Sequence, residues 1–300
     1  MKLKKLLAFG LIMSMTLGFT ACSSKESNTD KDSATNEQGT TEETSDDAGN
    51  ESENLAGTVV ITGSTSVEKI LLDMIDEFQA IHPDVKINYT GTGSSAGIQD
   101  AIDGVNSLGA SSRELKEEEL SQGLTADPFA YDGIAVVVHP SNDIKDVSLE
   151  DLAKIYSGQI TNWKELGGKD TEIVAVSREG ASGTKSAFEE LIGLEDAGGL
   201  TESATVVEGN GNVQTSVAGN ENAIGYVSFS FIDDTVKALT VGGVEANPEN
   251  AKSSDYKLSR PFLFAYKEDN LTPEAKAFVE FSKTEDAQAY VEEHGGIKLD

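Results

Sequence analysis

The apolar residues from position 57 onward follow two alternating patterns. Short runs of β-branched and other apolar residues, typical of strands, are separated by segments in which apolar residues recur every three or four positions, typical of helices. The clearest helical stripe runs from Val67 to Phe78, and the pair His82-Pro83 ends it. The run 134–138 is apolar throughout, as a strand buried in a parallel sheet is. This alternation predicts an α/β fold with mainly parallel sheets.

The boundaries of the predicted elements follow from these patterns and from the turn residues between them. Strands are expected at 57–62, 85–89, 134–138, 172–176, 224–229 and 262–266. Helices are expected at 67–80, 149–156, 183–191 and 272–290, and two more are expected to begin near Ser94 and near Ser111. The roughly 240 residues from Gly57 onward are enough for one large domain or two medium ones.

The residues before this folded part predict a secretory signal over 1–21. Three lysines among the first five residues precede an apolar run over 6–19, and small residues lead up to Cys22. The apolar run is shorter than the ~20 residues that a transmembrane helix needs. Because Cys22 is the only cysteine, an intrachain disulfide and a cysteine-based metal site are excluded.

Residues 22–56 predict a disordered acidic tether. They are almost entirely polar and carry ten acidic residues against Lys25 and Lys31, so they cannot bury enough apolar surface to offset the entropy lost on ordering. A cysteine directly after a signal resembles the lipobox of bacterial lipoproteins, although Phe19 stands where leucine is usual. That resemblance implies that Cys22 is lipidated and that the tether holds a folded domain at a membrane surface. The alternative is a plain signal peptide with an accidental cysteine.

The chain carries a net charge of −29, most of it in the folded part. Such an acidic surface argues against nucleic acid and anionic lipid as partners. It does not exclude a small anion, because remote surface charge is screened beyond about 8–10 Å at physiological salt and a buried site depends on its local dipoles.

Three predicted strands each run into a turn rich in Gly, Ser and Thr that opens a helix. These turns are 63–66, 91–97 and 178–184, and 109–113 is a weaker fourth case. The first N–H groups of a helix lack intrahelical partners and carry partial positive charge. Glycine lets the backbone approach a ligand closely. One such turn is a possible anion site, and several that converge with an arginine would surround a tetrahedral oxyanion with donors.

Each turn also has an ordinary structural explanation. The spacing Thr65-x-x-Glu68 fits a helix capping box, 91–97 fits a simple turn, and Arg178 alone is more often a surface residue. The phosphate-loop pattern Gly-x-x-x-x-Gly-Lys-Ser/Thr does not occur. The joint occurrence of the turns is therefore what favours an anion site.

Seven stretches carry distinctive motifs. In chain order they are 61–67 (ITGSTSV), 89–98 (YTGTGSSAGI), 108–113 (LGASSR), 132–138 (DGIAVVV), 152–163 (LAKIYSGQITNW), 178–184 (REGASGT) and 223–227 (AIGYV). This ordered set resembles the phosphate-binding proteins of high-affinity phosphate ABC transporters. The resemblance implies a fold like that of type II periplasmic binding proteins, with two α/β lobes joined by hinge strands and a ligand cleft between them. Lobe 1 would comprise 57–133 and 261–300, and lobe 2 would comprise 134–260.

The same resemblance implies which residues bind phosphate. The expected ligand residues are Thr65, Ser66, Ser94, Ser112, Arg178, Ser182, Gly183 and Thr184, with Val67, Ser95, Arg113 and Asp132 as a possible second tier. In this picture the turns that carry Thr65 and Ser94 come from lobe 1, and the turn after Arg178 comes from lobe 2. Lobe closure would exclude water and strengthen the charge-assisted hydrogen bonds.

One position departs from the family pattern. Many relatives carry an aspartate where this chain has Ser112, and that carboxylate accepts the proton of hydrogenphosphate and repels sulfate. Arg113 is either a second positive contact or half of a surface ion pair with Glu117. Asp132 is either the replacement acceptor or a turn residue.

Other classes of function fit the sequence less well. The three histidines, His82, His139 and His294, lie in no catalytic motif, and no metal-ligand spacing is present, so neither an enzyme nor a resident cofactor or metal is expected. Trp163 is expected to serve core or interlobe packing rather than sugar stacking. The sequence therefore predicts a monomeric, lipid-anchored protein that captures inorganic phosphate on the extracytoplasmic side for the permease of an ABC importer. The alternatives are another oxyanion such as sulfate or molybdate, and a phosphate-sensing surface lipoprotein.

Overall fold

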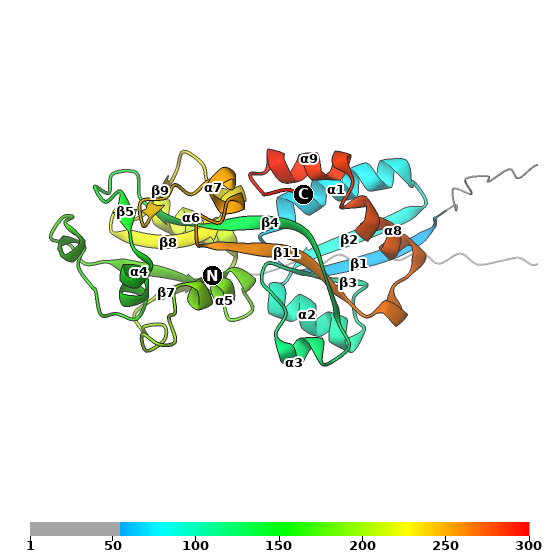
Figure 1. The fold of residues 1–300 in the computed structure, drawn as a ribbon, viewed down its shortest axis with the longest axis horizontal. Coiled ribbons are helices and arrows are strands. Elements are labelled where there is room, and N and C mark those ends of the chain that lie inside the picture. Colours follow the sequence, from blue (N-terminus) through cyan, green and yellow to red (C-terminus); the bar gives the residue numbers. More distant parts are fainter. Residues whose placement is uncertain (1–54, 300) are drawn as a thin grey trace, which may run out of the picture. The chain divides into compact units, whose positions relative to one another are not determined.

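The computed structural model describes residues 55–299 (Figure 1). The predicted signal, Cys22 and almost all of the predicted tether lie outside the described residues. The strands are β1 (Gly57–Gly63), β2 (Val85–Gly91), β3 (Leu108–Ser111), β4 (Thr125–Val138), β5 (Asp146–Val147), β6 (Val174–Arg178), β7 (Thr205–Val207), β8 (Ala223–Ser228), β9 (Lys237–Ala238), β10 (Thr240–Val241) and β11 (Ser259–Tyr266). The α-helices are α1 (Glu68–Ile81), α2 (Ser94–Asp103), α3 (Glu117–Leu120), α4 (Leu149–Tyr156), α5 (Gly183–Leu191), α6 (Gly209–Ala218), α7 (Pro248–Lys252), α8 (Pro273–Phe281) and α9 (Glu285–Glu293). Short 3-10 helices are η1 (Trp163–Leu166), η2 (Phe229–Phe231) and η3 (Glu268–Asn270).

The main sheet has the strand order β2-β1-β3-β11-β4-β8-β6-β7, with β9 also paired to β4. Strand β1 is parallel to β2 and β3, and β6 is parallel to β7 and β8. Between these parallel groups, β11 and β4 run antiparallel to each other and to their neighbours. The α/β alternation predicted from the sequence is confirmed, and its parallel pairing holds at both ends of the sheet.

Strand β4 differs from its prediction in length and direction. The expected strand over 134–138 is only the second half of a 14-residue strand, and this half pairs antiparallel with β8. The first half pairs antiparallel with β11, through a register that shifts between Phe262 and Leu263. An apolar run reports burial on both faces and not strand direction, which explains the error.

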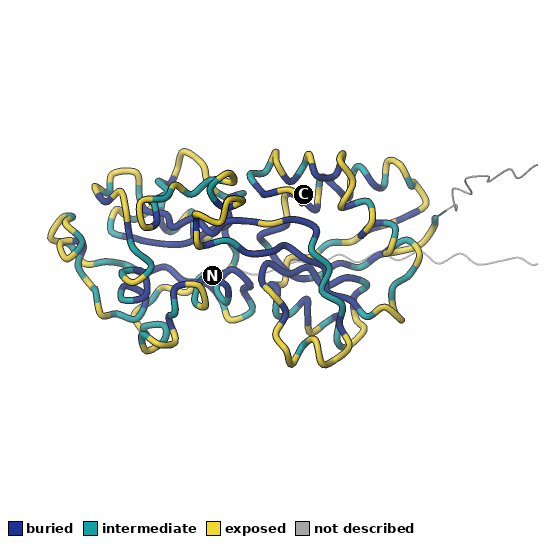
Figure 2. Tube along the Cα trace, viewed as in Figure 1, coloured by how far each residue is buried: buried dark blue, intermediate teal, exposed yellow. Residues whose placement is uncertain are grey.

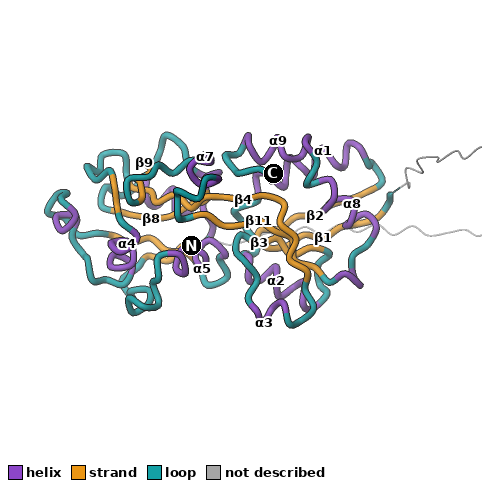
Figure 3. The backbone as a smooth tube through the Cα atoms, viewed as in Figure 1, coloured by secondary structure: helices purple, strands orange, loops and turns teal. Residues whose placement is uncertain are grey.

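The buried apolar residues form three clusters, of which two involve the same strand, β11, and are together termed the first core. The first core draws on residues 59–130 and 262–291, and the second draws on 134–258 together with Ile297. Within the first core, successive side chains of β11 point to opposite faces of the sheet. Phe262 and Phe264 pack with α1, α8 and α9 on one face, and Leu263 and Ala265 pack with α2 on the other. Helices therefore lie on both faces of the sheet, and the buried chain follows its central strands (Figures 2 and 3).

Most predicted helices are confirmed, α4 and α5 to the residue. The helix expected near Ser111 is wrong, because β3 ends there and only the four-residue α3 follows, from Glu117. The single helix expected over 272–290 is divided into α8 and α9, since Thr284 caps a new helix by accepting from the Ala287 N–H. Helix α6 was not predicted, because its segment has only two buried apolar residues, Val213 and Val217.

Candidate functional site

The predicted anion turns meet where the first-core and second-core parts of the chain approach each other. Because β1, β2 and β3 are mutually parallel, the turns that follow them lie at one edge of the sheet. Across from them, the turn after β6 leads into α5. Ser66 Oγ lies 2.8 Å from Thr184 Oγ1, and the Ser95 N–H donates to the Ala181 carbonyl at 3.1 Å. Turns distant in sequence are thus in direct contact.

The hydroxyl groups at this junction form a buried group that we term the hydroxyl cluster, defined as Thr65, Ser66, Ser94, Ser112 and Thr184. All but the half-buried Thr65 are at most 1% exposed. Ser94 Oγ accepts from the Ser112 N–H at 3.0 Å and lies 3.2 Å from Ser112 Oγ. Several hydroxyls held together without solvent are a potential source of donors for an anion.

Gly183 lets these hydroxyls approach the start of α5. A Cβ at this position would lie 2.1 Å from Ser94 Oγ, 2.7 Å from Ser94 Cβ and 2.8 Å from Ser112 Oγ. No side chain fits at these distances, so glycine is required here by close approach. Ser182 caps α5 by accepting from the Lys185 N–H, and the N–H groups that follow it open the helix.

Arg178 ends β6 and is 1% exposed. Its Nη2 donates to Thr65 Oγ1 at 3.2 Å, and its Nε and Nη2 form a bidentate pair with the carboxylate of Glu179. Its Nη1 is buried and has no hydrogen-bond partner within residues 55–299. Because an unpaired buried donor is costly, this atom is poised for a ligand acceptor.

The capping box proposed as an alternative for Thr65 does not form. Helix α1 has Val67 as its N-cap, and no side chain caps it. Thr65 instead contacts Arg178, and the side chain of Val67 is fully buried in the first core. Any contribution of Val67 to a ligand would come from its backbone.

Arg113 differs from one of the two expectations for it, the surface ion pair with Glu117. It is 5% exposed and pairs with Glu119, at 2.7 and 2.8 Å, rather than with Glu117. Burial raises the pKa of the Glu119 carboxyl, but the hydrogen bonds and charge of Arg113 and the Lys116 N–H outweigh it, so the net shift is downward. Arg113 also donates to Ser95 Oγ at 3.2 Å, so these second-tier residues contact each other.

Asp132 lies in strand β4 and not in a turn, which corrects one expectation for it. Its Oδ1 accepts from Ser228 Oγ and the Phe229 N–H, and its Oδ2 accepts from Nε and Nη2 of Arg260. Burial raises the pKa of Asp132, while the adjacent guanidinium opposes the rise. Both oxygens are therefore engaged with partners other than the hydroxyl cluster.

Sequence reasoning missed two residues that contact the cluster. Arg260 Nη2 donates to Ser66 Oγ at 3.2 Å, and its Nη1 donates to the Ser112 carbonyl at 3.0 Å. Asn210, in α6, donates from Nδ2 to Ser66 Oγ at 3.1 Å. A charged residue at the start of the apolar β11 segment was a usable signal for Arg260, whereas the segment around Asn210 has no pattern that marks it.

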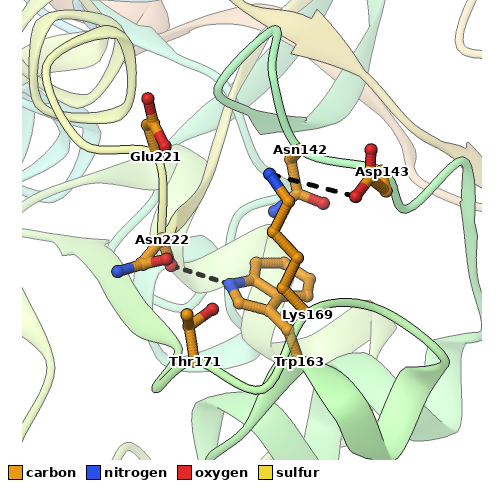
Figure 4. Close-up of a pocket in the computed structure, with 7 residues that line it drawn as sticks. All are labelled: Asn142, Asp143, Trp163, Lys169, Thr171, Glu221 and Asn222. Carbon is orange, nitrogen blue, oxygen red and sulfur yellow. Dashed lines mark hydrogen bonds and ion pairs between the residues drawn. The ribbon is translucent and has the colours of Figure 1, made fainter.

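A separate cavity of about 190 Å³ lies beside Trp163, between Asn142, Asp143, Lys169 and Asn222 (Figure 4). Trp163 is 2% exposed, packs in the second core and donates from Nε1 to the Asn222 carbonyl at 3.0 Å. Its predicted role in core packing is confirmed. None of the residues that line this cavity belongs to the hydroxyl cluster.

Residues 55–299 contain no group of three or more His, Cys, Asp or Glu placed to hold a metal ion. Over the same range, no helix has the length and apolar character required to span a bilayer.

Comparisons with known proteins identify the family. The profile of the PBP superfamily domain matches residues 48–286. The phosphate-binding protein PstS of Bacillus subtilis is 33% identical over 255 residues, which cover 83% of this chain and 83% of that protein. The chain belongs to the phosphate-binding protein family. A second member of this family, PstS of Borreliella burgdorferi, is 30% identical over 251 residues, covering 80% of this chain and 90% of that protein.

Solved structures related to the phosphate-binding protein family share the fold. A phosphate ABC transporter substrate-binding protein with bound phosphate from Clostridium perfringens has a TM-score of 0.79 and 48% identity, covering 81% of this chain and 100% of that one. An ABC-type phosphate transport receptor from Vibrio cholerae has a TM-score of 0.70 and 35% identity, covering 80% and 100%. The predicted fold, like that of periplasmic binding proteins, is confirmed. The relatives are named as binding proteins and receptors, not as enzymes.

Proposed function

We propose that this chain captures inorganic phosphate for an ABC importer and holds it at the hydroxyl cluster. The observation that carries the proposal is Arg178 Nη1, a buried donor with no hydrogen-bond partner within residues 55–299, beside hydroxyls that are excluded from solvent. A tetrahedral oxyanion would satisfy this donor and accept further hydrogen bonds from the cluster and the start of α5.

The ligand residues in this proposal are Thr65, Ser66, Ser94, Ser112, Arg178, Ser182, Gly183 and Thr184, with Val67, Ser95, Arg113 and Asp132 in supporting positions. Ser182 acts by capping α5. Arg113 and Ser95 support the turn at Ser94 through their mutual hydrogen bond. Asp132 acts through Arg260, because both of its oxygens already have partners.

We further propose two lobes, 57–133 with 261–300 and 134–260, that close on the anion. The division of the apolar residues into a first and a second core supports these boundaries. Ile297 is an exception, because it belongs to the first lobe by position and packs in the second core. Strands β4 and β11 run between the cores and are the candidate hinge. Contacts such as Ser66 with Thr184 then belong to the closed arrangement.

The anchoring and the partners are also part of the proposal. The signal-like residues 1–21 and the lone Cys22 support lipidation and an extracytoplasmic position, with 22–56 as the tether. The similarity to proteins named as binding components of phosphate ABC transporters supports a permease partner. We propose a monomer without catalytic activity, which delivers phosphate rather than only sensing it.

Calorimetric titration of the purified chain, freed of bound ligand, tests the binding function. We expect phosphate to bind at micromolar concentration or tighter, about 8 kcal/mol or more of binding free energy. Sulfate is titrated next, because the family resemblance implies that many relatives have a sulfate-repelling carboxylate where this chain has Ser112. Equal binding of both anions would support the broader oxyanion alternative, and binding of neither would contradict the proposal.

Membrane attachment is tested by changing the lipidation site. Cys22→Ser removes the thiol that would carry the lipid, so we expect the variant to appear in the soluble fraction while the unchanged chain stays with membranes. Retention of Cys22→Ser in the membrane fraction would contradict the lipoprotein proposal and leave phosphate binding untouched.

A further inference from the structure

The Ser66 hydroxyl has three hydrogen-bond partners, whereas a hydroxyl oxygen can accept only two hydrogen bonds. Its Oγ lies 3.1 Å from Asn210 Nδ2, 3.2 Å from Arg260 Nη2 and 2.8 Å from Thr184 Oγ1. The two nitrogens only donate, so they occupy both lone pairs of Oγ. The Ser66 proton must therefore be donated outward, toward Thr184 or toward a ligand.

Thr65 is in the same situation. Its Oγ1 lies 3.2 Å from Arg178 Nη2 and 3.5 Å from Asn210 Nδ2, and both of these groups donate. With its acceptor capacity used, Thr65 also has only a proton to offer. Two neighbouring hydroxyls are thus turned into donors by nitrogen groups behind them.

Asn210 is the group that these two hydroxyls share. It is 1% exposed, and its Oδ1 accepts from the Ser228 N–H at 3.1 Å. Because the backbone N–H has only a proton to give, this bond fixes which end of the amide is oxygen. The Nδ2 end must then face Thr65 and Ser66.

We propose that Asn210 is a specificity-determining residue of the anion site. By holding Thr65 and Ser66 as donors, it selects oxyanion oxygens that carry no proton, and so favours the dianion over the monoanion. This inference rests on the proposed phosphate binding and adds the charge state of the ligand. Among the cluster hydroxyls, Ser112 and Thr184 keep acceptor capacity for a ligand proton, because each contacts one other hydroxyl, that of Ser94 and that of Ser66.

The test is Asn210→Asp, which keeps the oxygen that accepts from Ser228 and replaces only the donating Nδ2 with an acceptor. The phosphate Kd is measured between about pH 6 and about pH 8, across the second ionisation of phosphate. In the unchanged chain we expect tighter binding as pH rises, because the dianion fraction grows. In Asn210→Asp we expect binding weaker by roughly 30-fold or more at the upper pH.

The slope of affinity with pH separates a selective role from a structural one. A carboxylate at position 210 can donate to Thr65 and Ser66 only after it takes up a proton, from the ligand or from solvent. The Asn210→Asp variant should therefore bind phosphate more tightly as pH falls, whereas the unchanged chain should bind it more tightly as pH rises. A residue that only packs would weaken binding equally at both pH values. The charged groups around Asn210 are Arg178 with Glu179 and Arg260 with Asp132. Glu68 and Glu208 also lie near it, because they line the same cavity of about 450 Å³ as Asn210.

Asn212→Asp is the matched control, since it makes the same chemical change two positions along α6. Asn212 is exposed and donates to the Glu208 carbonyl rather than to the cluster. The surrounding charges are common to both variants, so they cancel in the comparison. We expect Asn212→Asp to keep the affinity within about twofold and to keep the slope of the unchanged chain.

A second variant covers the possibility that Asn210→Asp does not fold. Asn210→Ala removes the donor without adding an acceptor, so Thr65 and Ser66 each regain a free lone pair. We expect affinity at the upper pH to fall about tenfold or more, and the rise of affinity with pH to become smaller than in the unchanged chain. The inference is overturned if Asn210→Asp keeps the original slope, or if Asn210→Ala binds within about twofold of the unchanged chain. Absence of phosphate binding by the unchanged chain would instead contradict the proposed function itself.

Discussion

The hydroxyl cluster and the cavity beside Trp163 are both polar regions next to strand ends, but their polar groups are satisfied differently. In the cluster, Ser66 and Thr184 contact each other directly, away from solvent, and the nearby Arg178 keeps an unpaired donor. Beside Trp163 there is open space of about 190 Å³, and Lys169 and Asp143 pair loosely at 3.9 Å with most of their side chains exposed.

This contrast shows which property indicates an anion site. Empty volume does not single out one place, because the cavity beside Trp163 (Figure 4) is smaller than a cavity of about 450 Å³ that Thr65 and Asn210 line. A closed oxyanion site has little empty volume, because donors from both parts of the chain converge on the position of one small ligand. Buried polar groups with unused donors are therefore the more informative signal here.

The largest effect is expected from Asp132→Asn, which tests how much the buried ion pair between Asp132 and Arg260, beside the hydroxyl cluster, contributes to stability. The Arg260 guanidinium would lose its carboxylate partner, and both side chains are at most 2% exposed. We expect the free energy of unfolding, measured by urea denaturation, to fall by about 3–5 kcal/mol.

The control for this change is Asp127→Asn on the same strand. Asp127 pairs with Lys283 at a partly exposed position, so a loss of about 1 kcal/mol or less is expected. Similar losses for the two variants would show that the Arg260 pair is no more important than a surface pair.

A smaller effect is expected from Gly183→Ala, which tests the close approach at the start of α5. The added Cβ would overlap Ser94, so the contacts of the closed arrangement should be lost. We expect phosphate affinity to fall by about 1–3 kcal/mol, as for other overpacked sites, with a small effect on unfolding.

Gly180→Ala provides the comparison in the same turn. A Cβ at Gly180 meets nothing within 4 Å, so its phosphate titration should match that of the unchanged chain. Equal affinities for all three proteins would contradict the account of a tightly closed site.

The smallest effect is expected from Trp163→Phe, which perturbs the cavity and not the cluster. Loss of the hydrogen bond to the Asn222 carbonyl should lower the free energy of unfolding by about 1 kcal/mol. Phosphate affinity should not change. A loss of affinity comparable to that of Gly183→Ala would mean that the cavity takes part in binding.

Local signals predicted much of this molecule. Helices α4 and α5 were predicted to the residue because Ser148 and Ser182 cap them and apolar residues follow at helical spacing. The turns at Ser66, Ser94 and Arg178 were recognisable because each combines small polar residues with a strand before and a helix after.

The features that were not predicted from the sequence depend on contacts between residues distant in sequence. The direction of β4 is set by its pairing with β8 and β11, which an apolar run cannot report. Arg260 reaches Ser66 from the opposite end of the folded chain, and Asn210 reaches it from a helix with little apolar periodicity. Such side chains become interpretable only when their partners are placed.

The most direct test of the central claim compares phosphate titrations of Arg178→Ala and Lys169→Ala. One variant removes the unpaired donor at the hydroxyl cluster, and the other removes a cation beside Trp163. We predict a loss of about 2 kcal/mol or more in binding free energy for Arg178→Ala and no change for Lys169→Ala. Unchanged affinity in Arg178→Ala, or a loss in Lys169→Ala alone, would place the phosphate site elsewhere and contradict the account.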